Sequence, residues 1–265
     1  MAGWFTRADC LALFCLSLAA LLVIIMGVQV WTIGLPALIF VVFLSDGIAR
    51  PSSPWLMPVV SHGPRDSNNV ALSFDDGPDP EVTPEILDLL KQHKAKATFF
   101  VIGRHLQQYP ELGRRIVEEG HELGNHSWTH ARTLNFRGAK HQQTEIERCN
   151  ALIQSIAGQK TLPLYRPPVG LKNPPLAAVV KRMGLDKVIA WSLHSKDTRS
   201  DDPDKIAGRV LSQVTAGDIL LFHDGHDLDG RGRPATPRAL DKVLRGLRDK
   251  KLAATSVSGL LSAHD

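Results

Sequence analysis

The first fifty residues differ in pattern from the rest of the chain. No Asp, Glu, Lys or Arg occurs between Cys10 and Leu44, whereas a membrane-spanning helix needs only about 20 apolar residues. The run is also longer than the roughly 7–15 residues of a signal-peptide core, and no small-residue cleavage site follows it. The pattern therefore predicts a membrane anchor over residues 1–45.

The apolar run divides in two. Residues 10–30 are enough for one span, Thr32, Gly34 and Pro36 interrupt the pattern, and residues 38–44 resume it. Two arrangements fit. A single span followed by an interfacial piece places the remaining chain opposite the N-terminus, whereas a helical hairpin returns it to the same side.

The flanking charges do not choose between these arrangements, because Arg7 lies at one end of the run and Arg50 at the other. We expect the protein in a bacterial inner membrane, with the rest of the chain periplasmic or otherwise extracytoplasmic. Residues 46–68 are rich in Pro, Ser and Gly and are typical of a linker and lead-in loop. A separate soluble domain is predicted over residues 69–265.

Short apolar runs alternate with helical patterns in this soluble part. Helices are predicted to begin at Thr83-Pro84 and Thr236-Pro237, and to lie near 110–119 and over 140–157. Seven runs are typical of strands: 70–74, 97–101, 121–124, 164–166, 188–192, 219–223 and 252–257. Most are followed by a helix, which predicts an α/β fold built from parallel βα units.

Composition narrows the function classes. The 265 residues include 31 Lys and Arg against 27 Asp and Glu, a net charge of +4 that is spread along the chain. Nucleic-acid binding needs a concentrated basic face, so no nucleic-acid partner is expected. With 43% hydrophobic and 22% charged residues, global disorder is excluded. Cys10, Cys15 and Cys149 do not suggest a disulfide.

Polar residues follow several predicted strands directly. Asp75 and Asp76 follow the first strand, Arg166 ends another, and His223 ends a third. The carboxyl ends of parallel strands face the active site in α/β folds, so these side chains are expected to converge.

Two histidines could share a metal with one of these carboxylates. His126 and His130 are four residues apart, so on a helical turn they would lie on one face. Two imidazoles and a carboxylate form a common catalytic zinc set with one position left for water. Two surface histidines on a helix would give the same spacing.

Arg166 and His223 each have a structural and a functional interpretation. Arg166 precedes Pro-Pro in an extended segment, so its guanidinium could hold a nearby carboxylate ionised. His223 ends an apolar strand, where Asp197 is a candidate partner that would orient the ring and raise its pKa. A structural arginine and a buried, hydrogen-bonded histidine are the alternatives.

The order of five motifs resembles the polysaccharide deacetylase family, also called the NodB-homology domain or family-four carbohydrate esterases. The motifs are S-F-D-D-G-P at 73–78, H-S-x-x-H at 126–130, R-x-P-x-G at 166–170, W-S-x-x-x-x-D at 191–197, and L-x-H at 221–223. The resemblance covers residues 69–257. It implies a distorted (β/α) barrel with fewer than eight units, consistent with seven.

The resemblance also implies roles for individual residues and a reaction, the hydrolytic removal of acetyl groups from N-acetylated sugars. Asp76, His126 and His130 would bind a divalent metal, commonly Zn²⁺. The remaining residues would carry out and tune proton transfer: Asp75 as catalytic base, Arg166 positioning Asp75, His223 as general acid, and Asp197 tuning His223.

The sequence departs from the family in the fourth motif. His194 stands where an aspartate is usual, and Thr198 stands where a tryptophan is usual. Because the acid, base and metal residues are all present, we expect altered substrate choice and retained catalysis. The expected substrate is an N-acetylated cell-envelope glycan.

Three other functions have some support in the sequence. Membrane anchoring would suit a lipid-linked amino sugar as substrate, and the altered motif would suit an inactive, membrane-tethered glycan-binding protein. Phosphoryl transfer by the aspartate pair is disfavoured, because the sequence lacks a phosphate-cradling glycine-rich loop.

Overall fold

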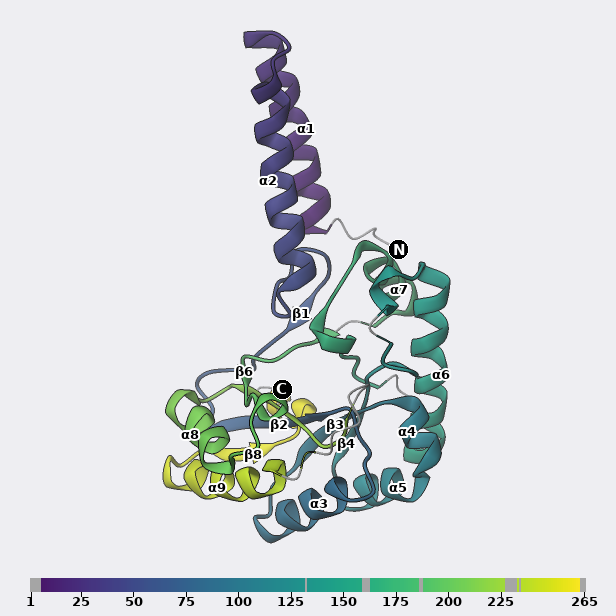
Figure 1. The fold of residues 1–265 in the computed structure, drawn as a ribbon, viewed down its shortest axis with the longest axis vertical. Coiled ribbons are helices and arrows are strands. Elements are labelled where there is room, and N and C mark those ends of the chain that lie inside the picture. The colour runs from purple at the N-terminus through teal and green to yellow at the C-terminus, as the bar shows by residue number, and fades with distance from the viewer. Residues whose placement is uncertain are drawn as a thin grey trace.

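Two long helices project from an α/β body (Figure 1). The structure, a computed structural model, describes residues 6–131, 133–158, 163–185, 188–226, 233 and 235–262. Helices α1 (Arg7–Met26) and α2 (Val30–Ala49) have 20 residues each, and both are long and apolar enough to cross a membrane. At about 1.5 Å per residue each is about 30 Å long, the thickness of a bilayer's hydrocarbon core.

The structure has the helical hairpin, but the break lies earlier than predicted. The chain turns at Gly27, where φ is +77°, and α2 begins after Gln29, whose backbone N–H donates to the Thr32 hydroxyl. Thr32 therefore caps the second helix. Pro36 lies inside α2, where it is buried and lines a seam with α1. The expected interruption at residues 32–36 is thus wrong.

The segment after the hairpin is more ordered than a linker. Helix α2 continues to Ala49, beyond the predicted end of the anchor at residue 45. Leu56 and Met57 are buried, and the backbone N–H of Ala8 donates to the carbonyl of Trp55. The foot of the hairpin is therefore packed onto the body through this segment.

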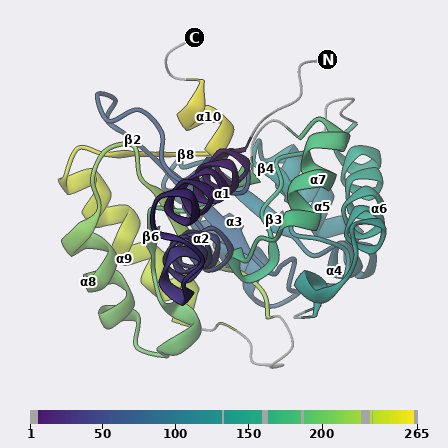
Figure 2. The same cartoon turned by 90° about the horizontal axis from the view of Figure 1, so that it is seen from above.

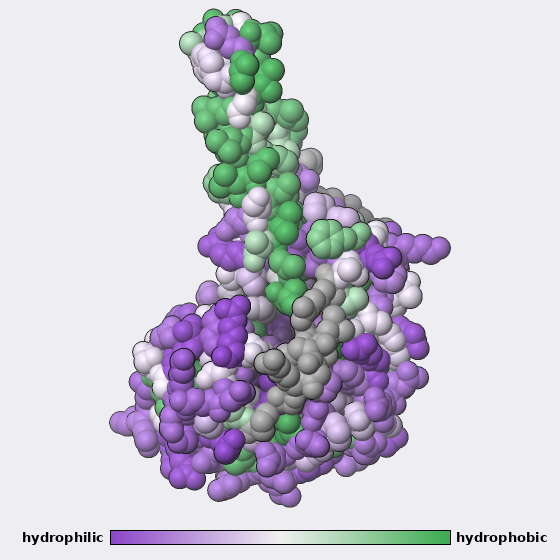
Figure 3. Space-filling model, in the orientation of Figure 1, coloured by the Kyte–Doolittle hydropathy of each residue, from purple (hydrophilic) through white to green (hydrophobic). Residues whose placement is uncertain are grey.

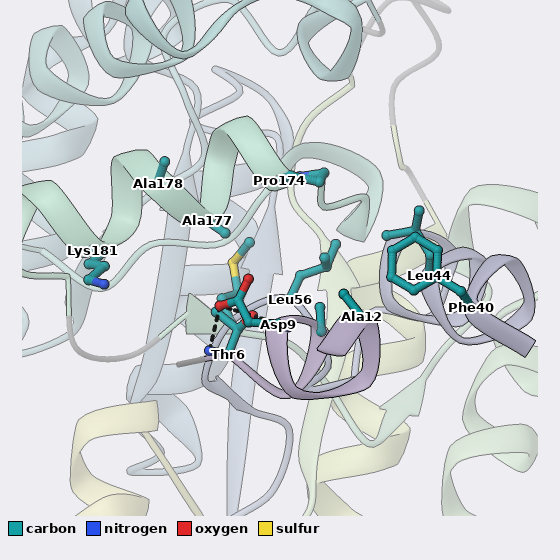
Figure 4. Close-up of a pocket in the computed structure, with 12 residues that line it drawn as sticks. Thr6, Asp9, Ala12, Phe40, Leu44, Leu56, Pro174, Ala177, Ala178 and Lys181 are labelled. Atoms are coloured by element: carbon teal, nitrogen blue, oxygen red, sulfur yellow. Dashed lines mark hydrogen bonds between the residues drawn. The ribbon is translucent and has the colours of Figure 1, made fainter. Parts of the chain in front are cut away.

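Helix α7 (Pro174–Met183) also contacts the foot of the hairpin. A pocket of about 360 Å³ lies there. Figure 4 shows four residues of its walls, Ala12 of α1, Phe40 and Leu44 of α2, and Ala177 of α7. Seen from above, the hairpin stands over the middle of the body (Figure 2). Figure 3 shows that its surface is mostly apolar, whereas that of the body is mostly polar.

The body is built on parallel strands, as the sequence pattern predicts. A six-stranded sheet has the order β4-β3-β2-β7-β6, with β8 added at the start of β2. Its strands are β2 (Asn69–Asp75), β3 (Ala97–Val101), β4 (Glu122–Asn125), β6 (Leu193–His194), β7 (Ile219–His223) and β8 (Ala253–Thr255). A second sheet pairs β1 (Val59–Val60) with β5 (Val188–Ile189).

Single bridges join the two sheets into a distorted ring. Tyr165 bridges Asn125 of β4 to Val188 of β5, and the chain then runs from β5 into β6, beside β7. The predicted run 164–166 is thus a one-residue bridge. In the run 188–192 only Val188 and Ile189 form a strand, β5, and β6 begins just after the run at Leu193. The α/β class is confirmed, but the predicted count of seven barrel units is not.

Helices pack around the strands, and their apolar faces form the core. Phe74 of β2 stacks on Phe99 of β3, with ring centroids 5.1 Å apart, and also contacts Phe222 of β7. The remaining helices are α3 (Val82–Gln92), α4 (Gly103–Gln108), α5 (Pro110–Glu118), α6 (Ala139–Ala157), α8 (Pro203–Gln213), α9 (Ala235–Asp249) and α10 (Val257–Leu261). The predicted helices near 110–119 and over 140–157 correspond to α5 and α6.

Two predicted helix starts are displaced slightly. Helix α3 begins at Val82, because Asp79 accepts hydrogen bonds from the backbone N–H groups of Glu81 and Val82. Thr83 is therefore inside the first turn, where its hydroxyl donates to Asp224. Helix α9 begins at Ala235, one residue before the predicted start at Thr236.

Candidate active site

The ends of the central strands bring the predicted site residues together. Asp75 on β2 lies directly opposite His223 on β7 in the parallel register. Arg166 follows the Tyr165 bridge, and its Nη1 donates to Asp75 Oδ1 over 2.6 Å. The expected convergence at the carboxyl ends of the strands is therefore what the structure has.

Asp76, His126 and His130 form a compact, buried set of metal-type donors. One ligand atom from each lies within 4.8 Å of the other two. Asp76 Oδ1 is 3.6 Å from His126 Nε2 and 3.4 Å from His130 Nε2. Two imidazole nitrogens and one carboxylate oxygen, all turned to one point, fit a divalent cation such as zinc.

The two histidines are not on a helical turn, so that part of the prediction is wrong. They lie in a loop after β4, where φ is +69° at Ser127 and +54° at His130. The Asn125 side-chain oxygen, Oδ1, accepts from the Ser127 N–H, and the Ser127 hydroxyl accepts from the His130 N–H. These side-chain bonds, in place of a helical ladder, bring His130 back beside His126.

A backbone contact fixes the orientation of the His126 ring. His126 Nδ1 is 2.8 Å from the carbonyl oxygen of Arg166. Since a carbonyl oxygen can only accept, Nδ1 carries the hydrogen, and Nε2 is left with its lone pair toward Asp76. This outer hydrogen bond to a metal-type histidine is common in metal sites.

Arg166 holds Asp75 from beneath. It is fully buried, its guanidinium also donates to the Ser73 hydroxyl and the Ala190 carbonyl, and it lies 3.9 Å from the Phe100 ring centre. Asp75 Oδ1 is engaged by Arg166, whereas Oδ2 lies 3.6 Å from His126 Nε2. Oδ2 is therefore the oxygen on the side of the metal-type donors.

His223 is paired with Asp197, as the sequence predicts. Its Nδ1 donates to Asp197 Oδ1 over 2.8 Å, and its backbone N–H donates to Oδ2. Burial lowers the pKa of His223, but the charge and hydrogen bond of Asp197 outweigh burial and raise that pKa to about 9. The ring is therefore protonated at neutral pH.

Two hydroxyl groups that sequence reasoning missed complete the environment of Asp197. Ser195 Oγ donates to Asp197 Oδ1, and Thr236 Oγ1 donates to Oδ2. Thr236 is 39 residues further along the chain, so no local motif signals this contact. Ser195 falls within the fourth motif but at a position that the motif leaves open.

A cavity of about 650 Å³ joins these groups. Among the described residues, its walls include the predicted Asp75, Asp76, His126, His130 and His223. Arg166 and Asp197 support this set from behind. Ala49, Pro51, Val169, Trp191 and Leu221 form apolar parts of the wall, and His194, Lys196, Thr198, Arg199 and Arg233 form polar parts. Ala49 and Pro51 belong to the foot of the hairpin, so the cavity lies beside it.

The polysaccharide deacetylase family profile matches residues 62–188. A peptidoglycan-N-acetylglucosamine deacetylase of Bacillus cereus is 36% identical over 200 residues, which cover 75% of this chain and 90% of the relative. A chitooligosaccharide deacetylase of Sinorhizobium fredii is 34% identical over 188 residues, which cover 69% and 86%. This chain belongs to the polysaccharide deacetylase family. The predicted class of enzyme, a carbohydrate N-deacetylase, is thereby confirmed.

Solved structures of this family share the fold. The crystal structure of the Bc1960 peptidoglycan N-acetylglucosamine deacetylase superposes with a TM-score of 0.69 at 31% identity, covering 76% of this chain and 91% of that one. A family pseudoenzyme from Bacillus anthracis superposes with a TM-score of 0.68 at 25% identity, covering 77% and 68%. Because an inactive protein shares the polysaccharide deacetylase fold, activity must be argued from the site residues.

Proposed function

We propose that this polysaccharide deacetylase-family chain hydrolyses the N-acetyl group of an amino sugar in a cell-envelope glycan, with the help of a divalent metal. The observation that carries the proposal is one cavity in which Asp75 and His223, opposite each other on neighbouring strands, adjoin the Asp76–His126–His130 donor set. The relatives' activity on peptidoglycan and chitooligosaccharides supports the substrate class.

Asp76, His126 and His130 would hold the metal, most simply Zn²⁺, since the donors are two imidazoles and a carboxylate. When bound, such an ion polarises a carbonyl group and lowers the pKa of water. The other residues of the site carry the proton transfers of the reaction.

Asp75 acts as the general base in this mechanism. Arg166 engages Oδ1, so Oδ2 is the oxygen that accepts a proton as the water oxygen attacks the amide carbon. The ion pair also prevents the carboxylate from rotating, because Arg166 is itself fixed by Ser73 and two backbone carbonyls.

His223 acts as the general acid. Its Nδ1 is held by Asp197, so Nε2 carries the proton that the departing sugar nitrogen receives as the C–N bond breaks. The products are acetate and a free amino sugar. A neutral amine leaves much more readily than an amide anion, so this proton is needed at the moment of cleavage.

The test compares Asp75→Asn and His223→Ala with wild type, using acetate release from N-acetylchitotetraose and from peptidoglycan. General acid–base groups contribute about 10²–10⁴-fold each, and losses of that size are expected. Asp201→Asn, an exposed carboxylate outside the cavity, is the matched control and should keep wild-type turnover. Turnover close to wild type in either active-site variant, with metal content unchanged, would remove that residue from the mechanism.

The inactive alternative makes the opposite prediction. A tethered glycan-binding protein would bind these substrates but release no acetate after loading with Zn²⁺. The pseudoenzyme with the same fold makes this comparison necessary, whereas the complete set of acid, base and metal-type residues supports activity.

We further propose that the hairpin anchors the catalytic domain to the outer face of the inner membrane, where peptidoglycan lies. A hairpin puts both chain termini on one side of the bilayer, so reporter fusions at either end must give the same extracytoplasmic answer. The positive-inside rule alone would favour the opposite side, because Arg7 and Arg50 both flank the hairpin at its foot. A cytoplasmic result would leave a lipid-linked precursor as the accessible substrate.

A further inference from the structure

One wall of the cavity carries side chains that donate hydrogen bonds. Lys196, Arg199 and Arg233 line it together with His194. Among the described residues, the carboxylates that line the cavity are Asp75 and Asp76. Three cations thus face two acids, before any metal adds its own charge.

The two acids do not pair with Lys196 or Arg199. Asp75 is already paired with Arg166, and Asp76 faces the two histidines of the metal-type set. In the described part of the chain, the side chains of Lys196 and Arg199 form no ion pair or hydrogen bond. The positive charges of Lys196 and Arg199 therefore do not serve to neutralise Asp75 and Asp76.

Local backbone geometry turns this segment toward the cavity. Lys196 has a φ of +66°, a left-handed conformation that residues with a side chain seldom adopt. Its backbone N–H donates to His194 Nδ1, so the hydrogen of the neutral His194 ring is on Nε2. Asp197 is buried beneath and holds His223. Asp197 therefore points inward to His223, whereas its neighbours Lys196 and Arg199 line the cavity.

We propose that Lys196 and Arg199, with Arg233 and His194, form a subsite for an anionic group, a phosphate or carboxylate, carried by the N-acetylated amino sugar. This inference rests on the proposed function and narrows its substrate class. Lys196 and Arg199 have no carboxylate partner among the described residues, so their charges favour an anionic acceptor, and each charge-assisted bond is stronger than a neutral one.

The apolar part of the same cavity indicates where such an anion could come from. Ala49 and Pro51 at the foot of the hairpin line the cavity, and Val169 beside them is 48% exposed. A phosphate that links a sugar to a lipid would present its charge and its apolar chain together at this place. A soluble sugar phosphate would present the charge alone.

The experiment uses three matched substrates with the full-length, Zn²⁺-loaded protein in detergent micelles: N-acetylglucosamine, N-acetylglucosamine 1-phosphate and its farnesyl diester. The expected kcat/KM is at least about tenfold higher for the phosphate than for the neutral sugar, the effect of one charged hydrogen bond. A further increase for the diester identifies a lipid-linked source, whereas equal values for the two phosphates identify a soluble one.

The variants locate the effect in the subsite. The double variant Lys196→Met, Arg199→Met should lower the phosphate-to-neutral ratio of kcat/KM by about 10- to 100-fold, for the loss of one or two charged contacts. Lys205→Met, an exposed cation outside the cavity, should leave the ratio unchanged. Circular dichroism checks that the variants are folded.

Equal kcat/KM for the neutral and phosphorylated sugars, or a ratio that the double variant does not change, would overturn the subsite while leaving deacetylation intact. If none of the substrates releases acetate, the proposed function fails, and calorimetric binding then tests the subsite alone. Tighter binding of the phosphate than of the neutral sugar, weakened in the double variant, would sustain it. Equal binding would overturn it.

Discussion

Replacing Asp197 with asparagine tests how this protein keeps His223, the proposed general acid, protonated. Burial alone lowers the pKa of His223, and the charge and hydrogen bond of Asp197, helped by Asp76 and Asp75, raise it to about 9. The net rise from 6.5 corresponds to about 3 kcal/mol in favour of the charged ring, at 1.36 kcal/mol per pKa unit. Without the Asp197 charge, burial should dominate, and the pKa of His223 should fall below 6.5.

The pH profile of kcat/KM reports this change, because its alkaline limb follows the acid of the free enzyme. The wild-type limb should fall near pH 9, and the Asp197→Asn limb at least about two pH units lower. At pH 8 the variant, with a pKa below 6.5, should therefore lose at least about 30-fold in kcat/KM, and the two proteins should approach each other only below the variant's own pKa.

A stability measurement checks the same linkage independently. The folded pKa of His223 lies above its unfolded value, so the stabilisation is present in full below about pH 6.5 and is lost as pH rises through about 9. The difference in unfolding free energy between wild type and Asp197→Asn should shrink accordingly from pH 6 to pH 10.

Thr236→Val provides the matched control, because it removes a hydrogen bond to Asp197 Oδ2 but keeps the carboxylate charge. Its alkaline limb should move by less than about one pH unit, the size of a neutral hydrogen bond. An Asp197→Asn profile that falls by the same factor at every pH, with the limb unmoved, would refute the electrostatic explanation.

Three other predictions follow from the site and its supports. Removing the divalent metal with a chelator should abolish acetate release, and Zn²⁺ should restore it. The unfolding free energy should fall by about 2.7 kcal/mol relative to protein with metal at 100 times its Kd. An unchanged melting temperature would argue against a bound metal. Arg166→Ala should destabilise the fold by about 3–5 kcal/mol in urea unfolding, because it leaves Asp75 buried and unpaired, and a loss below about 1 kcal/mol would contradict this. Gly170→Ala should lower kcat/KM about 10- to 100-fold with metal content unchanged. The φ of Gly170 is +71°, and a Cβ there would lie 2.6 Å from Pro51 and 2.7 Å from Trp191, which both line the cavity. Wild-type kinetics would show that this wall does not position substrate.

The structure also bears on how the apolar helical hairpin and the candidate site are connected. Lys172 is buried, and its ammonium group donates to the backbone carbonyls of Arg50 and Pro51, just after α2 ends. The same Pro51 lines the catalytic cavity. The foot of the hairpin is therefore part of the wall of the site, and is fixed to it by a cation that caps a helix end.

Several features could be predicted locally. The absence of charge between Cys10 and Leu44 is sufficient to indicate membrane-compatible helices, because burying a charge in hydrocarbon is costly at any position. The runs 70–74, 97–101 and 219–223 are strands because they are apolar, short and bounded by polar turns. Placement of Asp75 and His223 at strand ends follows from those boundaries.

Other features depended on contacts between distant segments. The turn of the hairpin lies at Gly27 and not at Pro36, because Thr32 caps α2 and the proline packs against α1. His126 and His130 meet through a loop held by the side chains of Asn125 and Ser127. The spacing of the two histidines correctly indicated that they lie close together. The helical turn proposed to explain that spacing was wrong.

The amino-acid sequence by itself determined the apolar anchor, the alternating α/β pattern, the family and the residue types available for the chemistry, since each of these depends on short-range order along the chain. Tertiary structure alone decided that Arg166 engages Oδ1 of Asp75, and that Thr236 supports Asp197. It also decided that Ala49, Pro51 and Lys196 share one cavity with the metal-type donors. Asp75 and Arg166, for example, are 91 residues apart in the sequence. The geometry of such contacts is fixed only when the strands take their register and the side chains pack between them.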